Sequence, residues 1–218
     1  MTGRLLDVYH RLLKHYGPQH WWPADSPFEV IIGAILTQSA AWSNVEKAIN
    51  NLKSKEALSV AALRRLPADE LARLVYPSGY YNAKAAKIKS FVDWLGEQYD
   101  GDLDSLFRLD TPALRRELLS VSGVGEETAD SIMLYAARKP IFVIDAYTRR
   151  IVGRLGLAPQ VDSYAAFQEL FMRHLLPDEA LFNEYHALFV RHGKDVCQKS
   201  PRCQQCCLAS LCSLHRVP

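Results

Sequence analysis

The amino-acid sequence predicts an all-α fold, and three observations support this prediction. Apolar residues recur at helical spacing along most of the chain. Several of these segments begin with residues that cap helices. The one apolar run that resembles a strand, residues 141–144, has no second strand candidate with which to pair. We therefore expect helices throughout.

The expected helices follow in order. Residues 4–16 form a short amphipathic helix, and a very apolar helix over 28–38 opens at the capping box Ser26-Pro27-Phe28-Glu29. A second capping box, Ser43-Asn44-Val45-Glu46, opens the next helix. Further helices are expected at 57–65, 68–76, 82–99, 112–120, 126–137, 146–155, 163–174 and 178–192. Trp21 and Trp22 interrupt this series; in a helical segment they cannot both face one core, so we expect at least one to edge a cleft.

Composition bounds the class of protein. The chain has 218 residues, of which 49% are hydrophobic and 23% charged, which is typical of a soluble globular protein. The net charge is only +2, so any nucleic-acid-binding surface must be local. No apolar run approaches the length of a membrane span, and the N-terminus lacks the apolar core of a signal peptide. We expect a cytoplasmic monomer, nucleoid-associated if the source is bacterial.

The cysteines lie together near the C-terminus. All five fall within residues 197–212, so no disulfide framework spans the fold. Cys197, Cys203, Cys206 and Cys212 have the spacing Cys-x5-Cys-x2-Cys-x5-Cys. Four thiolates so close together in an intracellular protein indicate a metal site. Composition alone leaves zinc and an iron–sulfur cluster as alternatives.

The segment from residue 118 to residue 150 carries the strongest functional signal. Gly123-Val124-Gly125 allows a tight turn, and the helix that follows points its free N–H groups out of the turn, which suits an anion such as a phosphate. The apolar run 141–144 then delivers Asp145 to the head of another helix. Taken singly, the turn could be a plain helix connector and Asp145 a plain N-cap.

Together, the stretch 121–129 and the pair Ile144-Asp145 resemble the hairpin and catalytic segment of helix-hairpin-helix DNA glycosylases of the endonuclease III superfamily. The resemblance implies two helical subdomains flanking a cleft. One is a six-helix barrel over 27–138 with the hairpin motif at about 114–137. The other combines 1–26 with 139–218 and carries the loop 197–212. The partner implied is double-stranded DNA containing a damaged base.

Site roles follow from the same resemblance. Asp145 would stabilise oxocarbenium character at C1′ of a flipped nucleotide and orient a water molecule. The hairpin residues Gly123, Val124 and Gly125 would hold a backbone phosphate through their N–H groups. Gln38 would fill the gap left by the flipped base, although it could simply be a polar helix end.

The cysteine loop is similar to the 4Fe–4S loop of endonuclease III, with Cys207 as a bystander. Five residues separate its first two cysteine ligands, one fewer than the usual six.

Glu127 departs from the family pattern. Bifunctional relatives carry a lysine at this position, whose amine attacks C1′ and then cuts the strand. A carboxylate cannot form that imine, so we expect base removal without strand cleavage. Glu127 could equally be an exposed acid that suits the first turn of its helix.

Further motifs are Trp21-Trp22-Pro23, Leu36-Thr37-Gln38, the stretch from Pro77 to Lys84, Gly125-Glu126-Glu127 and His192-Gly193-Lys194. Together they resemble the 3-methyladenine DNA glycosylase branch, some members of which lack the iron–sulfur loop. In that branch the base pocket would be formed by Trp21, Trp22, Pro23, Trp42 and Lys194. Alkylated purines are cationic, so aromatic walls would attract them. His186 and His192 are interpreted as packing or surface residues.

We therefore expect a monofunctional glycosylase for alkylated purines. The alternatives are a mismatch or oxidised-base glycosylase of the endonuclease III type, a non-catalytic DNA-binding protein that uses the hairpin, and a zinc-stabilised scaffold.

Overall fold

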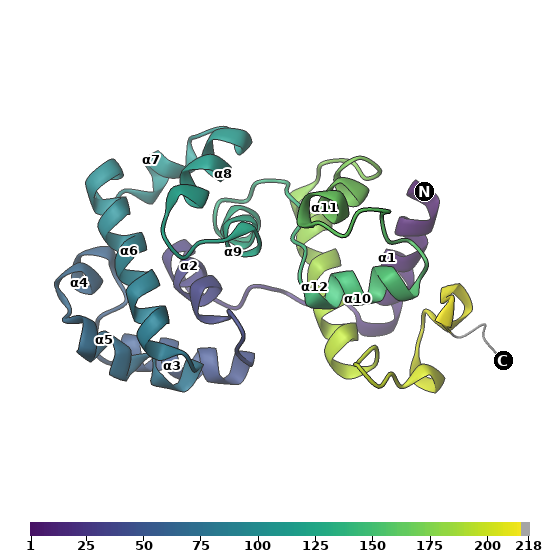
Figure 1. Ribbon diagram of the computed structural model, residues 1–218, viewed down its shortest axis with the longest axis horizontal. Coiled ribbons are helices and arrows are strands. Elements are labelled where there is room, and N and C mark those ends of the chain that lie inside the picture. The colour runs from purple at the N-terminus through teal and green to yellow at the C-terminus, as the bar shows by residue number, and fades with distance from the viewer. Residues whose placement is uncertain (215–218) are drawn as a thin grey trace. The chain divides into compact units, whose positions relative to one another are not determined.

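The computed structural model describes residues 1–214 and confirms the all-α fold, with no strand among these residues (Figure 1). The chain divides into two compact units. One unit is the continuous segment Ala24–Lys139, and the other combines Met1–Pro23 with the chain from Pro140 onward. No helix within the described residues is long and apolar enough to cross a membrane.

Helix α2, Pro27–Leu36, is the centre of the first unit. Every residue from Phe28 to Leu36 is buried, because the helix packs against α3, α6, α9 and η2. The other elements of this unit are α3 (Trp42–Ser54), α4 (Val60–Arg65), α5 (Ala68–Leu74), η1 (Tyr76–Ser78), α6 (Tyr81–Tyr99), α7 (Leu103–Phe107), α8 (Thr111–Ser120), α9 (Glu126–Ser131) and the π-helical turn η2 (Ile132–Ala136). The short helix α7 was not predicted; its N-cap is Asp102, whose carboxylate accepts from two backbone N–H groups.

One of the two predicted capping boxes is present in the structure. Ser26 Oγ accepts a hydrogen bond of 3.2 Å from Glu29 N and starts α2, with Pro27 in the first turn. The box at Ser43 was wrong, because α3 begins at Trp42 with Ala41 in the N-cap position. The carbonyl of Ala41 already accepts from the N–H groups of Asn44 and Val45. Ser43 therefore lies inside the first turn.

A buried ion pair joins the two helices of the hairpin motif. Arg115 of α8 binds both carboxylate oxygens of Asp130 of α9, at 2.8 and 3.2 Å, and Asp130 is fully buried. A bidentate pair fixes the angle of two helices better than a single contact does. The connecting turn is thus held from its inner side while its tip remains exposed.

The second unit is built on α12, Glu179–Asp195. The helices α1 (Thr2–Tyr16) and α10 (Ala146–Arg154) both pack against it (Figure 1). An aromatic cluster fills the core, in which the rings of Phe142 and Phe171 stack at 3.8 Å and Tyr185 meets both edge-on. The remaining elements are α11 (Tyr164–Met172), η3 (Cys203–Gln205) and η4 (Ala209–Leu211).

The segment that carries Trp21 and Trp22 is not helical, so the premise that they lie in a helix was wrong. Helix α1 ends at Tyr16, and residues 17–24 have no regular secondary structure. Gly17 follows with a φ of 69°, a left-handed value that glycine adopts without strain. The tryptophans therefore belong to a connecting segment and are both half-buried.

Candidate functional site

Asp145 is the N-cap of α10 and lies at the end of the buried run 141–144. Its Oδ1 accepts a hydrogen bond of 2.7 Å from Thr148 N, and the residue is only 8% exposed. The cap occupies one carboxylate oxygen and fixes the side chain at the positive end of the helix dipole. A buried apolar run on one side and a helix on the other thus hold this carboxylate in one orientation.

His186 of α12 faces the other oxygen of this carboxylate. Its Nε2 lies 3.6 Å from Asp145 Oδ2, and both side chains are buried. Burial lowers the pKa of His186, and the nearby Asp145 carboxylate only partly opposes this effect. Sequence reasoning missed this neighbour, because a histidine in a helical pattern gives no signal of a partner 41 positions away in the sequence. His192 is also buried, with Tyr16 Oη 2.9 Å from its Nδ1.

The hairpin turn lies in the other unit. Gly123 has a φ of 87°, and Val124 N donates to Val121 O at 3.1 Å. Val124 is buried and anchors the turn, while Gly123 and Gly125 are exposed. Gly125 is the N-cap of α9, and no side chain caps that helix. The exposed backbone of the turn is therefore available to an anion.

Gln38 lies beside the same turn. It follows α2, and its Nε2 donates to Thr128 Oγ1 at 2.9 Å and to Gly123 O at 3.3 Å. Its Oε1 accepts from Lys87 Nζ of α6. The structure therefore brings Gln38 and the hairpin together within one unit.

Lys84 is a buried cation that sequence reasoning used only as part of a family motif. It is 2% exposed, and its Nζ donates to Leu36 O at 2.8 Å and to Ser78 O at 2.6 Å. Leu36 is the last residue of α2, so the ammonium satisfies a carbonyl at the negative end of that helix. Burial lowers the pKa of Lys84 to about 8, with repulsion from Lys87 as a second cause.

The five residues expected to line a base pocket are divided between the units. The rings of Trp21 and Trp22 contact each other with centroids 5.0 Å apart, and Pro23 follows them, exposed. Lys194 is exposed in the last turn of α12, in the same unit as the tryptophans. Trp42 is the first residue of α3, in the unit that holds the hairpin. Glu127 is exposed in the first turn of α9.

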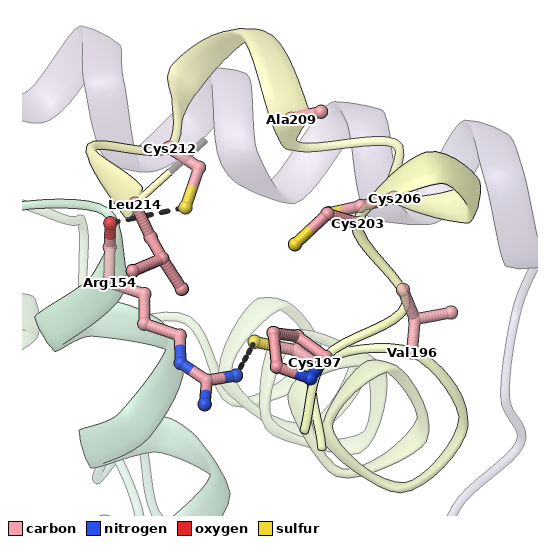
Figure 2. Close-up of a pocket in the computed structure, with 9 residues that line it drawn as sticks. Arg154, Val196, Cys197, Cys203, Cys206, Ala209, Cys212 and Leu214 are labelled. Atoms are coloured by element: carbon pink, nitrogen blue, oxygen red, sulfur yellow. Dashed lines mark hydrogen bonds between the residues drawn. The ribbon is translucent and has the colours of Figure 1, made fainter. Parts of the chain in front are cut away.

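Four of the five cysteines line one pocket. Figure 2 shows Cys197, Cys203, Cys206 and Cys212 around it, with Cys207 absent from its lining. Arg154 completes the polar part of the wall and donates to Cys197 Sγ at 3.3 Å and to Gln198 O at 2.6 Å. Its own carbonyl accepts from Cys212 Sγ at 3.2 Å, so Arg154 holds both ends of the loop.

The donor set of this pocket fits a metal group that takes four thiolates. No group of three or more His, Cys, Asp or Glu side chains within residues 1–214 has the spacing of an ion site as the side chains stand. The fit rests instead on four thiols that line one pocket, with the Arg154 guanidinium donating a hydrogen bond to Cys197 Sγ.

Comparison with known proteins assigns the class. Residues 32–177, about two thirds of the chain, match the family described as "HhH-GPD superfamily base excision DNA repair protein". The chain is also 44% identical over 207 residues to "Putative DNA repair glycosylase MJ1434" of Methanocaldococcus jannaschii, with 94% of each chain covered. The protein therefore belongs to the HhH-GPD superfamily. It is a DNA glycosylase of base excision repair, a hydrolase of N-glycosidic bonds.

Two solved structures resemble all or most of the chain. A trapped covalent intermediate of endonuclease III with DNA has a TM-score of 0.84 at 22% identity, covering 99% of this chain and 97% of that one. The 3-methyladenine DNA glycosylase MagIII of Helicobacter pylori, bound to 1,N6-ethenoadenine, has a TM-score of 0.72 at 25% identity, covering 88% and 95%. At 22% identity, the likeness to the endonuclease III complex shows the shared fold alone.

Proposed function

We propose that this glycosylase excises alkylated purines of the 3-methyladenine type from duplex DNA and has no Schiff-base lyase activity. The observation that carries the proposal is Glu127, which occupies the position where the resemblance to bifunctional relatives implies a lysine. A carboxylate has no amine with which to attack C1′, so the covalent route is closed at this position.

Asp145 would act on the sugar. As the glycosidic bond breaks, positive charge develops at C1′ and the ring oxygen, and a carboxylate held in one orientation stabilises that charge without reorganising. The cap to Thr148 fixes Asp145, and a neutral His186 leaves the negative charge of the carboxylate uncompensated. The same carboxylate would orient the water molecule that attacks C1′.

An alkylated purine suits a site of this kind. Such a base carries positive charge and leaves without being protonated, so one carboxylate suffices. Two adjacent tryptophans, Trp21 and Trp22, offer faces that attract a cationic ring. MagIII, a 3-methyladenine DNA glycosylase bound to 1,N6-ethenoadenine, is similar to this chain over most of its length.

The partner in this proposal is double-stranded DNA with a damaged base. The hairpin Gly123-Val124-Gly125 would bind a backbone phosphate, and Gln38 would fill the gap left by the flipped base. Cys197, Cys203, Cys206 and Cys212 would hold a 4Fe–4S cluster, which would stabilise the loop 197–212. Zinc is the alternative occupant.

Excision of an oxidised or mismatched base is a second candidate function. The 30% identity over 212 residues to "Endonuclease III" of Thermotoga maritima favours it. Only the identity of the released base distinguishes the two.

The test uses duplex DNA treated with a methylating agent and, in parallel, a duplex with a single oxidised pyrimidine. Chromatography identifies the bases released by the purified protein. Release of 3-methyladenine with the oxidised duplex left intact supports the proposal. Release of the oxidised base alone would replace it with the second candidate.

A further inference from the structure

A chain of hydrogen bonds links Lys87 and Gln38 to the hairpin. Lys87 Nζ of α6 donates to Gln38 Oε1, and Gln38 Nε2 donates to Thr128 Oγ1 and to Gly123 O. All the polar atoms of the Gln38 side chain are thereby engaged. In this arrangement Gln38 is folded onto the hairpin and Lys87 holds it there.

The stem of Lys87 lies directly over the turn. A Cβ atom added to Gly123 would collide with the Cγ, Cδ and Cβ atoms of Lys87, so position 123 requires glycine for space as well as for its φ of 87°. This packing keeps the ammonium group of Lys87 next to the turn and limits its freedom to move away.

The positive charge at this place is not neutralised. Lys84 and Lys87 are one turn apart on α6, and burial, with repulsion from Lys87 as the second cause, lowers the pKa of Lys84. In the part of the chain that the structure describes, neither lysine forms a salt bridge. Arg115 on the inner side of the hairpin, by contrast, is paired with Asp130. The half-buried Lys87 therefore places an uncompensated cation beside the turn.

We propose that Lys87 binds a DNA phosphate beside the hairpin, and that Gln38 occupies its ammonium group until the phosphate arrives. This proposal rests on the proposed function only in requiring that the hairpin bind DNA. A phosphate oxygen is charged, so it forms a stronger hydrogen bond with an ammonium than a neutral amide oxygen does. Phosphate binding would thus release the Gln38 side chain from the hairpin at the moment when DNA is present.

The first test measures the salt dependence of binding to an undamaged duplex, which does not depend on which lesion is excised. Each phosphate neutralised by a protein cation contributes about 0.9 to the slope of log K against log salt concentration. We expect Lys87→Met to make this negative slope shallower by about 0.9, and Lys87→Arg to leave it unchanged. Lys47→Met is the matched control, because Lys47 is exposed on α3 in the same unit.

The second test concerns Gln38. If its amide competes with phosphate for Lys87, then Gln38→Ala binds the undamaged duplex more tightly than the wild type. The same substitution made in Lys87→Met gives no such gain. A Gln38→Ala effect that is equal in both backgrounds would overturn the competition.

The outcomes separate the two proposals. A wild type that binds DNA with a slope that Lys87→Met leaves unchanged would overturn the phosphate contact and leave the glycosylase proposal intact. A wild type that does not bind duplex DNA would overturn both. Because Lys87→Arg keeps the charge, a loss of slope in that variant would also contradict the contact.

Discussion

The imidazole of His186 lies against the carboxylate of Asp145, with Nε2 and Oδ2 3.6 Å apart in a buried environment. The histidine comes from α12 and the aspartate from the N-terminus of α10, two helices that pack together. Burial lowers the pKa of His186, so the imidazole is neutral near pH 7. The aspartate therefore has a polar neighbour that does not cancel its charge.

The burial of His186 predicts a loss of stability in mild acid. The unfolded chain has a His186 pKa near 6.5, and the folded value is lower. As the pH falls below about 6.5, the unfolded state takes up the proton first, so the free energy of unfolding decreases. His186→Gln removes this pH-dependent contribution to stability. Between pH 7 and pH 5 the melting temperature of the variant should therefore fall less than that of the wild type. His10→Gln, an exposed site on α1, is the control. Equal acid sensitivity in all three proteins would contradict the prediction.

Lys84→Met should destabilise the protein. The substitution leaves the carbonyl oxygens of Leu36 and Ser78 buried without the ammonium, at a cost of about 2–4 kcal/mol in the free energy of unfolding. Denaturant titration measures this cost. Lys89→Met is the matched control. Lys89 donates to three backbone carbonyls but is only half-buried, so water can replace its ammonium and the loss of stability is smaller.

Comparison of the wild type with Lys84→Met should also show the pH at which buried Lys84 loses its proton. Its pKa is about 8 when folded and near 10.5 when unfolded, so between these values the unfolded state holds more protons. The free energy of unfolding of the wild type should therefore rise relative to that of Lys84→Met as the pH increases from 8 to 10. A constant difference across this range would contradict the low pKa.

The cysteine pocket predicts which residues bind iron. Chemical analysis of the purified protein should find about four iron atoms and matching sulfide per chain. Cys203→Ser should lose most of this iron, since Cys203 lines the pocket, whereas Cys207→Ser should keep it. Zinc in place of iron would favour the alternative occupant. Equal iron loss in both variants would contradict the assignment of four ligands.

Glu127→Lys should introduce lyase chemistry. The substitution restores the amine that bifunctional relatives use, at an exposed position in the first turn of α9. We expect borohydride to trap a covalent adduct between this variant and DNA that contains an abasic site. Glu126→Lys, the neighbouring position, is the control and should give no adduct. Adducts with both variants or with neither would contradict the claim that position 127 is where an amine can attack C1′.

The sequence predicted the elements whose signals are local. The Ser26 cap, the turn at Gly123 and the position of Asp145 at a helix N-terminus all depend on residues within a few positions of one another. The four cysteines that line one pocket are likewise close in the chain. In these cases, residues close together in the sequence are sufficient to predict the structure.

Contacts between distant segments were not predicted. Nothing near His186 in the sequence points to Asp145, and nothing near Lys84 or Lys87 points to Leu36 or Gln38, because these pairs form only when helices pack. The errors at Ser43 and at Trp21 and Trp22 have a different cause. Each came from applying a helical pattern at a boundary, where one residue decides whether a position lies inside the helix.

The most direct test of the central claim compares the wild type with Asp145→Asn on one alkylated duplex, with and without hot alkali. Asparagine can keep the cap to Thr148, so the fold should survive. The wild type should give strand breaks only after alkali, and Asp145→Asn should lose at least about a hundredfold in rate. Wild-type breaks that appear without alkali and are trapped by borohydride, or full activity in Asp145→Asn, would contradict a monofunctional glycosylase that acts through this carboxylate.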